Sequence, residues 1–192
     1  MKIQEAIDKR HSIREFEPKP VPKRVIEELI KDASKAPSGK NEQPWRFYIV
    51  YSEDKRNLII NKTKNLISSR EFKSLKPKIR KIAEKFYSDF GGAPHIILVY
   101  REKKKKEPSY QYFNDIAGIS SAIQNLMLAA VEKGLGTCWV GTFKGIEKEI
   151  NRIIRIPKNH QFVVGILLGY PKKGSKPLIR KKKKLNEILK FV

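Results

Sequence analysis

Apolar and polar positions along the chain follow two different periods. Residues 22–35 carry apolar side chains three and four positions apart, which is typical of a helix with one buried face. Pro22 suits the first position of this helix, and Pro37 ends it. Short, continuous apolar runs are instead typical of strands. They occur at residues 46–51, 95–100, 136–141 and 161–170. The pattern therefore predicts four strands separated by helices.

The longest helix is predicted from about Tyr110 to Lys133, with Gly134 as its C-terminal stop. It is apolar over a wide arc, so we expect it to be the buried central helix. Shorter helices are predicted at residues 2–9, from Ser52 onward, over Lys76–Asp89 and at 145–154. Helices that alternate with four strands indicate an α+β structure, with residues 1–192 forming one domain.

Composition supports a folded protein and excludes several classes. Of the 192 residues, 40% are apolar, which is enough for a packed core. A single cysteine excludes a disulfide framework. The first residues (MKIQEAIDKRHSIREF) are too polar for a signal peptide, and no apolar run approaches the ~20 residues that span a bilayer. We therefore expect a soluble protein of the cytoplasm.

The formal charge of +22 raises the question of a nucleic-acid partner. Residues 55–85 hold 11 basic and 2 acidic residues, and most of the remaining excess lies at 101–107 and 171–192. In 55–85 the basic residues are scattered along amphipathic helical patterns, which favours solvated helix faces. A surface for nucleic acid or an acidic partner is the alternative. In either case, the positive potential of these residues also favours the binding of anionic small molecules.

Few residues suit conventional catalysis. His11, His95, His160 and Cys138 lack the spacing of a metal site, so none is expected. Cys138 lies in an apolar strand and is predicted to be a buried structural thiol. The chain has no GxGxxG, no GxxxxGK[ST] and no nucleophile turn.

Four polar clusters stand out in otherwise apolar surroundings. In the first, Arg10 and Ser12 could bind a phosphate through a guanidinium fork and a hydroxyl, and Arg14 would share their face of an extended segment. Taken alone, this cluster is better explained as a helix C-terminus that carries cations. The fourth cluster is Arg180, an arginine among the lysines of the tail.

The second cluster is a loop between Pro37 and Trp45, whose amide side chains could bind the edge of a heterocycle. A structured turn without a ligand explains the loop equally well, and Trp45 by itself is predicted to belong to the core. The third cluster, Gly136–Phe143, offers an unobstructed backbone N–H at Gly141, directly after a strand.

Together the four clusters make the chain resemble the FMN-dependent nitroreductase family. The residues that carry the resemblance are RHSIREF (10–16), APSGKNEQPWRFYIV (36–50), DIAGISSAIQNLMLAAVEKGLGTCWVG (115–141) and LLGYP (167–171). The resemblance implies a nitroreductase-like α+β fold with a central mixed or antiparallel sheet flanked by helices. It also implies a homodimer with two FMN sites at the subunit interface, each built by both chains.

The resemblance also implies roles for particular residues. Arg10 and Ser12 would bind the phosphate and ribityl region, with His11 in the same block, and Arg14 would face the pyrimidine end of the ring. The partner subunit would supply Pro37, Ser38, Gly39 and Asn41, and Gln43 belongs to that block. Trp139 and Val140 would lie along the ring, the N–H of Gly141 would lie near N5, and Arg180 would complete phosphate binding.

The activity implied is hydride transfer from NADH or NADPH through flavin N5 to nitroaromatics, quinones or other electron-poor acceptors. No side chain is then needed as a catalytic acid or base. The alternatives are other flavin chemistry on the same fold (reductive dehalogenation, heterocycle oxidation or flavin breakdown) or a non-catalytic basic binding protein. Flavin contacts from the basic helices are open, with Lys78 and Arg80 as candidates.

Overall fold

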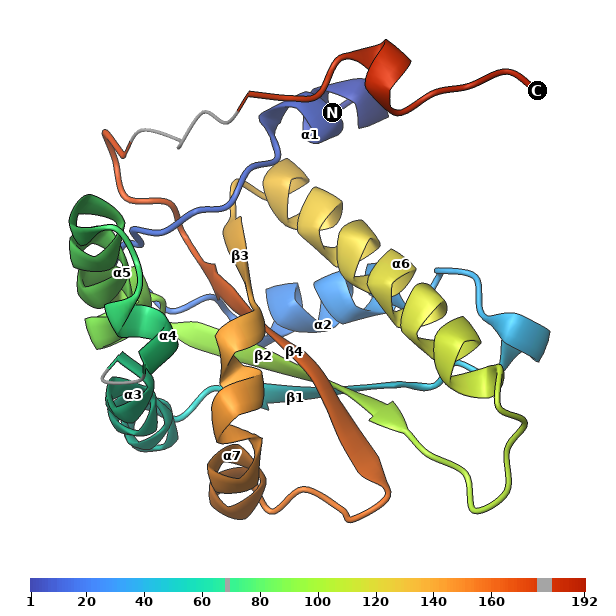
Figure 1. Ribbon diagram of the computed structural model, residues 1–192, viewed down its shortest axis with the longest axis horizontal. Coiled ribbons are helices and arrows are strands. Elements are labelled where there is room, and N and C mark those ends of the chain that lie inside the picture. Colours follow the sequence, from blue (N-terminus) through green and yellow to red (C-terminus); the bar gives the residue numbers. More distant parts are fainter. Residues whose placement is uncertain (68–69, 176–180) are drawn as a thin grey trace.

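Figure 1 shows the computed structural model, which describes residues 1–67, 70–175 and 181–192. The helices are α1 (Ile3–Lys9), α2 (Lys23–Ala33), α3 (Glu53–Ile67), α4 (Arg70–Lys73), α5 (Pro77–Asp89), α6 (Gln111–Glu132) and α7 (Glu147–Ile154). The strands are β1 (Trp45–Val50), β2 (His95–Glu102), β3 (Gly136–Val140) and β4 (His160–Gly169). Short 3-10 turns cover Gly39–Asn41, Phe90–Gly92, Gly141–Ile146 and Leu185–Glu187. Arg180 lies outside the described residues.

The four strands form one sheet in the order β1-β2-β4-β3, and each neighbouring pair is antiparallel. Helices cover both faces of this sheet (Figure 1). Side chains of a strand alternate between faces. Accordingly, Ile97 and Val99 of β2 pack with α2 and α6, whereas Ile96 and Leu98 pack with α3 and the segment around Phe143. The predicted α+β class, with a sheet flanked by helices, is confirmed.

The predicted elements are found close to their expected positions. Two differences have physical causes. The helix expected from residue 145 begins at Glu147, because the chain first winds through a 3-10 turn after β3. Strand β2 continues past Tyr100 to Glu102 because the buried Arg101 is neutralised by acidic partners. Trp45 and Cys138 are both buried, as predicted.

Helix α6 is the central helix, as its apolar pattern predicts. One side packs on α2 and the sheet, and Gly134 follows its end with a φ of 68°. From Gln111 to Val131 its single charged residue is Asp115, which is buried. Within the described ranges of the chain, no helix is both long enough and apolar enough to cross a membrane.

Candidate functional site

The first and third sequence clusters lie side by side. Ser12 forms a parallel bridge with Thr137 of β3, and the Ile13 N–H donates to the Thr137 carbonyl at 2.9 Å. The pairing extends the sheet edge with the segment Ser12–Phe16, so Arg14 lies close to Cys138. Residues more than 120 positions apart in the sequence thus form one surface.

Gly91 holds this segment from its other side. The Phe16 N–H donates to the Gly91 carbonyl at 2.8 Å. Gly91 has a φ of 65°, and a Cβ on it would lie 1.8 Å from the carbonyl oxygen of Arg14. Any other residue at position 91 would collide with the backbone that carries Arg14. The Ser12–Phe16 segment is therefore fixed between β3 and the turn after α5.

A cleft of about 630 Å³ opens beside this segment. Its volume lies within the usual range for small-molecule sites, roughly 300–1,000 Å³. The walls carry the cations Arg14, Lys85 and Lys172 and the apolar side chains Ile82 and Phe86. Glu15 and Asp89 also line the cleft, and Lys85 Nζ lies 3.3 Å from a Glu15 carboxylate oxygen. Cations beside an apolar wall suit an anionic ligand with an aromatic part.

The other predicted residues at this end lie just after α1 and at the end of β3, and only some of them line the cleft. His11 and Ser12 line it, and Arg10 is the half-buried residue that ends α1. At the end of β3, Val140 is buried, whereas Trp139 is 43% exposed. Gly141 has open space around it, because no atom lies within 4 Å of the position a Cβ would take. The backbone after β3 is thus accessible to a ligand.

Two features near this surface were not anticipated. Thr142 follows Gly141, and its buried hydroxyl oxygen has no hydrogen-bond partner among the described residues. Lys85 lines the cleft, whereas Lys78 and Arg80, the candidates from the sequence, do not. The spacing of Ile82, Lys85, Phe86 and Asp89 on one face of α5 is the signal that could have identified Lys85.

The environment of Cys138 makes it a poor nucleophile. Burial raises the pKa of its thiol, and the charge of Arg14 and a hydrogen bond with Ser12 oppose this effect only in part. Since thiolates are the reactive form, Cys138 stays an unreactive thiol at neutral pH. This agrees with its predicted structural role.

The second cluster lies at the opposite end of α6. A Cβ on Gly118 would lie 3.1 Å from the Pro37 carbonyl, and one on Gly39 would lie 3.9 Å from the Cβ of Asn114. The Pro37–Gln43 loop therefore packs on the N-terminal part of α6, whereas Ser12 lies beside β3, which follows the C-terminal end. At 1.5 Å per residue, Asn114 and Glu132 are about 27 Å apart along the helix. One chain does not bring the two clusters together.

The loop itself has an unusual backbone. Lys40, Asn41 and Gln43 have φ values of 52°, 54° and 47°, in the left-handed region that non-glycine residues rarely adopt. The Gln43 N–H donates to Ser38 Oγ at 3.1 Å, and Gln43 Nε2 donates to Asn41 Oδ1 at 3.2 Å. The Asn41 and Gln43 side chains are exposed, so a ligand from outside the chain can reach their amides.

Comparison with known proteins finds relatives that match most of this chain. The sequence profile of the nitroreductase family matches residues 7–170. YfhC of Bacillus subtilis, provisionally named an NAD(P)H nitroreductase, is 34% identical over 170 residues, which cover 88% of this chain and 84% of YfhC.

Two further proteins broaden the comparison. Iodotyrosine deiodinase of Danio rerio is 30% identical over 196 residues, which cover 95% of this chain and 64% of that protein. The structure of a nitroreductase with bound FMN from Desulfitobacterium hafniense matches with a TM-score of 0.78 at 21% identity, and the match covers 100% of this chain and 99% of that one. The predicted nitroreductase-like fold is confirmed, and the chain belongs to the nitroreductase family.

Proposed function

We propose that this protein is an FMN-dependent oxidoreductase whose flavin site is completed by a second copy of the chain. In our proposal it takes hydride from NADH or NADPH and passes it to nitroaromatics, quinones or similar electron-poor acceptors. One observation carries the proposal. Two polar clusters, each suited to a different part of a flavin, lie at opposite ends of α6, so a two-fold partner is needed to bring them to one ligand.

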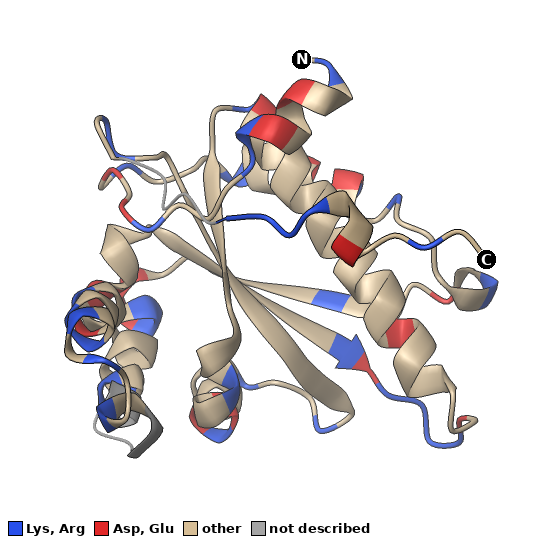
Figure 2. Ribbon diagram, turned by 45° about the horizontal axis from the view of Figure 1, so that its top comes forward, with Lys and Arg blue, Asp and Glu red and all other residues tan. Residues whose placement is uncertain are grey.

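The surface of α6 supports a second copy as that partner. In a chain with 32% charged residues, the exposed side of this helix carries no charge from Gln111 to Val131 (Figure 2). Phe113 on it is 74% exposed, and Ala117 and Gln124 follow on the same side. Depletion of charge with exposed aromatic side chains is typical of the centre of a protein interface. Two antiparallel copies of α6 would bring the loop of one chain to the cleft of the other.

The residues present fit FMN. Arg10 and Ser12 would bind the phosphate and the ribityl chain, with Arg180 as the further arginine expected there, and Arg14 would face the pyrimidine end of the ring. Gly141 and the exposed Trp139 provide an open backbone and a flat apolar surface for the ring. The partner's loop would supply the amides of Asn41 and Gln43 for the ring edge.

Bound FMN would supply the redox chemistry, because it accepts and donates hydride. The chain's own task is then to orient the ring, to place positive charge beside it and to leave one face open. Arg14 would supply that charge from a segment whose backbone is held between β3 and Gly91.

The proposal is tested first by colour and reduction. Purified protein should be yellow with a flavin spectrum, and the colour should bleach under anaerobic conditions on addition of NADH or NADPH. A flavin that neither nucleotide reduces would overturn the oxidoreductase activity proposed. A colourless protein that does not take up FMN would overturn the cofactor assignment, and salt-sensitive binding of nucleic acid by that protein would favour a basic binding protein.

Arginine variants test the phosphate site. Arg10→Ala and Arg180→Ala each remove a charge-assisted hydrogen bond, worth about 1.5–3 kcal/mol. FMN affinity should fall about ten- to hundredfold in each variant, measured by quenching of flavin fluorescence, while the far-UV circular dichroism stays unchanged. Unchanged affinity in both variants would place the phosphate elsewhere.

Reductive dehalogenation is a second candidate function, favoured by the 30% identity to iodotyrosine deiodinase over 95% of this chain. Both functions require the same flavin site, so the acceptor distinguishes them. Chemically reduced protein mixed with iodotyrosine should reoxidise and release iodide if the second function holds. Faster reoxidation by a nitroaromatic or a quinone, with no iodide released, would support the first.

A further inference from the structure

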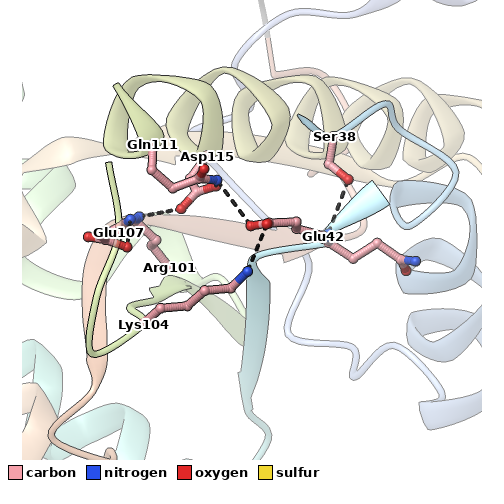
Figure 3. Close-up of polar contacts among 8 residues, drawn as sticks. Ser38, Glu42, Arg101, Lys104, Glu107, Gln111 and Asp115 are labelled. Atoms are coloured by element: carbon pink, nitrogen blue, oxygen red, sulfur yellow. Dashed lines mark hydrogen bonds and ion pairs between the residues drawn. The ribbon is translucent and has the colours of Figure 1, made fainter. Parts of the chain in front are cut away.

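A buried ionic cluster connects β2, the N-terminus of α6 and the Pro37–Gln43 loop. At its centre is Arg101, the last buried residue of β2 and 1% exposed (Figure 3). Its Nε donates to Asp115 Oδ2 at 2.6 Å, and its guanidinium also pairs with Glu107. The ring of Tyr112 lies 5.4 Å from the Arg101 Cζ atom. Arg101 therefore fixes the first turns of α6 against the sheet.

The cluster continues from α6 to the loop. Gln111 Nε2 donates to Asp115 Oδ1 at 2.7 Å and to Glu42 Oε2 at 3.1 Å. Figure 3 shows the Gln111 side chain between these two carboxylates, with Lys104 on the other side of Glu42. The Lys104 Nζ atom lies 2.8 Å from Glu42 Oε1. Arg101 and Glu42 are thus joined through Asp115 and Gln111.

Stability alone explains this cluster poorly. Removing ionised side chains from water is costly, and apolar residues of similar size are often at least as stabilising. The hydrogen bonds do fix the ionised state. Burial alone would lower the pKa of Arg101, but the hydrogen bonds with Glu107 and Asp115 outweigh burial and raise it. Beyond stability, a hydrogen-bonded ionic cluster fixes the relative orientation of the residues that it joins, because each contact has a defined geometry.

The Pro37–Gln43 loop is the segment whose backbone needs to be held in this way. Three of its non-glycine residues have positive φ, and such residues persist only where their surroundings hold them. The N–H groups of Asn41, Glu42 and Gln43 donate to Ser38 O, Gly39 O and Ser38 Oγ at 3.0–3.1 Å. Glu42 is half-buried, and its carboxylate turns toward α6, whereas its neighbours Asn41 and Gln43 are exposed. Glu42 thus attaches the loop to α6 through a polar side-chain contact, in addition to the packing of Pro37 and Gly39 on the helix.

We propose that Arg101 is a positioning residue for the flavin site. It acts through Asp115 and Gln111 on Glu42 and so holds the loop in the shape in which its amides meet the FMN of the partner subunit. This inference rests on the proposed function, because it assigns the loop to that flavin. Without the cluster, the loop would sample other shapes, and part of the binding free energy would be used to order it.

Two variants interrupt the connection without opening the Arg101–Asp115 pair. Glu42→Ala removes the attachment point, and Gln111→Leu removes the amide that bridges to it while keeping the volume. Both variants remove the hydrogen bond between Gln111 and Glu42, and each should raise the dissociation constant of FMN on the order of tenfold, as expected when one charge-assisted hydrogen bond between α6 and the loop is lost. The double variant should raise it no further than the larger single effect, because the two side chains act in series.

Arg101→Lys tests the origin of the connection, because lysine keeps the charge but cannot hold two carboxylates with a planar fork. It should weaken FMN binding to a similar extent. If this variant does not fold, Glu42→Ala and Gln111→Leu decide the question. Lys133→Met is the matched control, since it removes the 2.6 Å pair with Glu28 at the other end of α6. FMN binding in this control should be unchanged.

Amide hydrogen exchange of the flavin-free protein supplies a readout independent of FMN. The amides of Asn41, Glu42 and Gln43 should exchange faster in Glu42→Ala and Gln111→Leu than in the wild type, and not in Lys133→Met. The positioning role alone would be overturned if the wild type binds FMN and if Glu42→Ala and Gln111→Leu change neither the FMN affinity nor the exchange of the loop amides. Wild-type protein that does not bind FMN would overturn the proposed function, and with it the flavin role of the loop.

Discussion

Replacing Gly91 with alanine should both destabilise the protein and weaken its candidate flavin site. Two separate effects act at this position. With a φ of 65°, the backbone lies in a region that costs a non-glycine residue about 1–2 kcal/mol. In addition, the new Cβ would lie 1.8 Å from the Arg14 carbonyl oxygen, where contacts below 3.0 Å essentially never occur.

The second effect can be estimated from the structure. To reach 3.0 Å, the Arg14 carbonyl and the alanine must separate by more than 1 Å, the difference between 3.0 and 1.8 Å. Such a shift disrupts the 2.8 Å hydrogen bond from the Phe16 N–H to the Gly91 carbonyl. Loss of one such bond costs about 0.5–1.5 kcal/mol. Gly91→Ala should therefore lower the free energy of unfolding by roughly 1.5–3.5 kcal/mol, with backbone strain and the lost bond combined.

Gly134→Ala separates the two effects. Gly134 has nearly the same φ, 68°, but no atom lies within 4 Å of its Cβ position. This variant should lose only the backbone term, about 1–2 kcal/mol. Urea unfolding of flavin-free wild type and both variants, at one protein concentration, measures the difference. The FMN dissociation constant should rise in Gly91→Ala alone, because only there does the backbone of Arg14 move.

Equal losses of stability in the two glycine variants would refute this reasoning. They would mean that the Ser12–Phe16 segment yields to the new methyl group at no cost. The segment would then not be held between β3 and Gly91, and Arg14 would lack a fixed position beside the cleft.

Three further predictions concern other parts of the molecule. Burial and the nearby Arg56 charge lower the pKa of His95, whose Nε2 accepts the Val21 N–H at 2.9 Å. As the pH falls below about 6.5, the pKa of histidine in the unfolded chain, the wild type should therefore lose stability relative to His95→Gln. The loss should reach up to about 1.4 kcal/mol per pH unit, measured by urea unfolding at each pH. Phe113→Lys on the uncharged side of α6 should dissociate the proposed dimer in sedimentation experiments, whereas Leu58→Lys on α3, also an exposed position, should not. Cys138 should react with iodoacetamide far more slowly in native than in urea-unfolded protein, because burial raises the pKa of its thiol; equal rates would contradict its burial.

The elements were predictable because their signals are local. The period of α6, the apolar run of β2 and the glycine after α6 each act over a few residues. The 3-10 turn after β3 was not predicted, because its residues lack a helical period and Phe143 is fixed by packing with Phe90 instead. The buried Arg101 was also missed. Nothing local distinguishes an arginine with acidic partners 6 and 14 positions away from one that begins a lysine-rich loop.

The candidate site, too, could be predicted only in part from the sequence. The motifs identified the residues at both ends of α6, but not that one chain keeps them near opposite ends of a helix whose residues Asn114 and Glu132 are about 27 Å apart along its axis. That distance follows from α6 lying between them, which is a tertiary property. Lys172 contacts Glu15 and Gly91 contacts Arg14 only because the fold brings distant segments of the chain together. No spacing in the sequence indicates those contacts.

A site divided between two chains couples flavin binding to subunit association. If FMN binds only where two chains meet, a concentration 100 times its dissociation constant stabilises the dimer by about 2.7 kcal/mol at each site. Two sites give about 5 kcal/mol, or roughly four orders of magnitude in the dimer dissociation constant. Sedimentation of flavin-free and flavin-saturated protein over a range of dilutions measures this difference. Identical dissociation constants would mean that each chain binds its flavin alone, and the separation of the two clusters along α6 would then have no functional meaning.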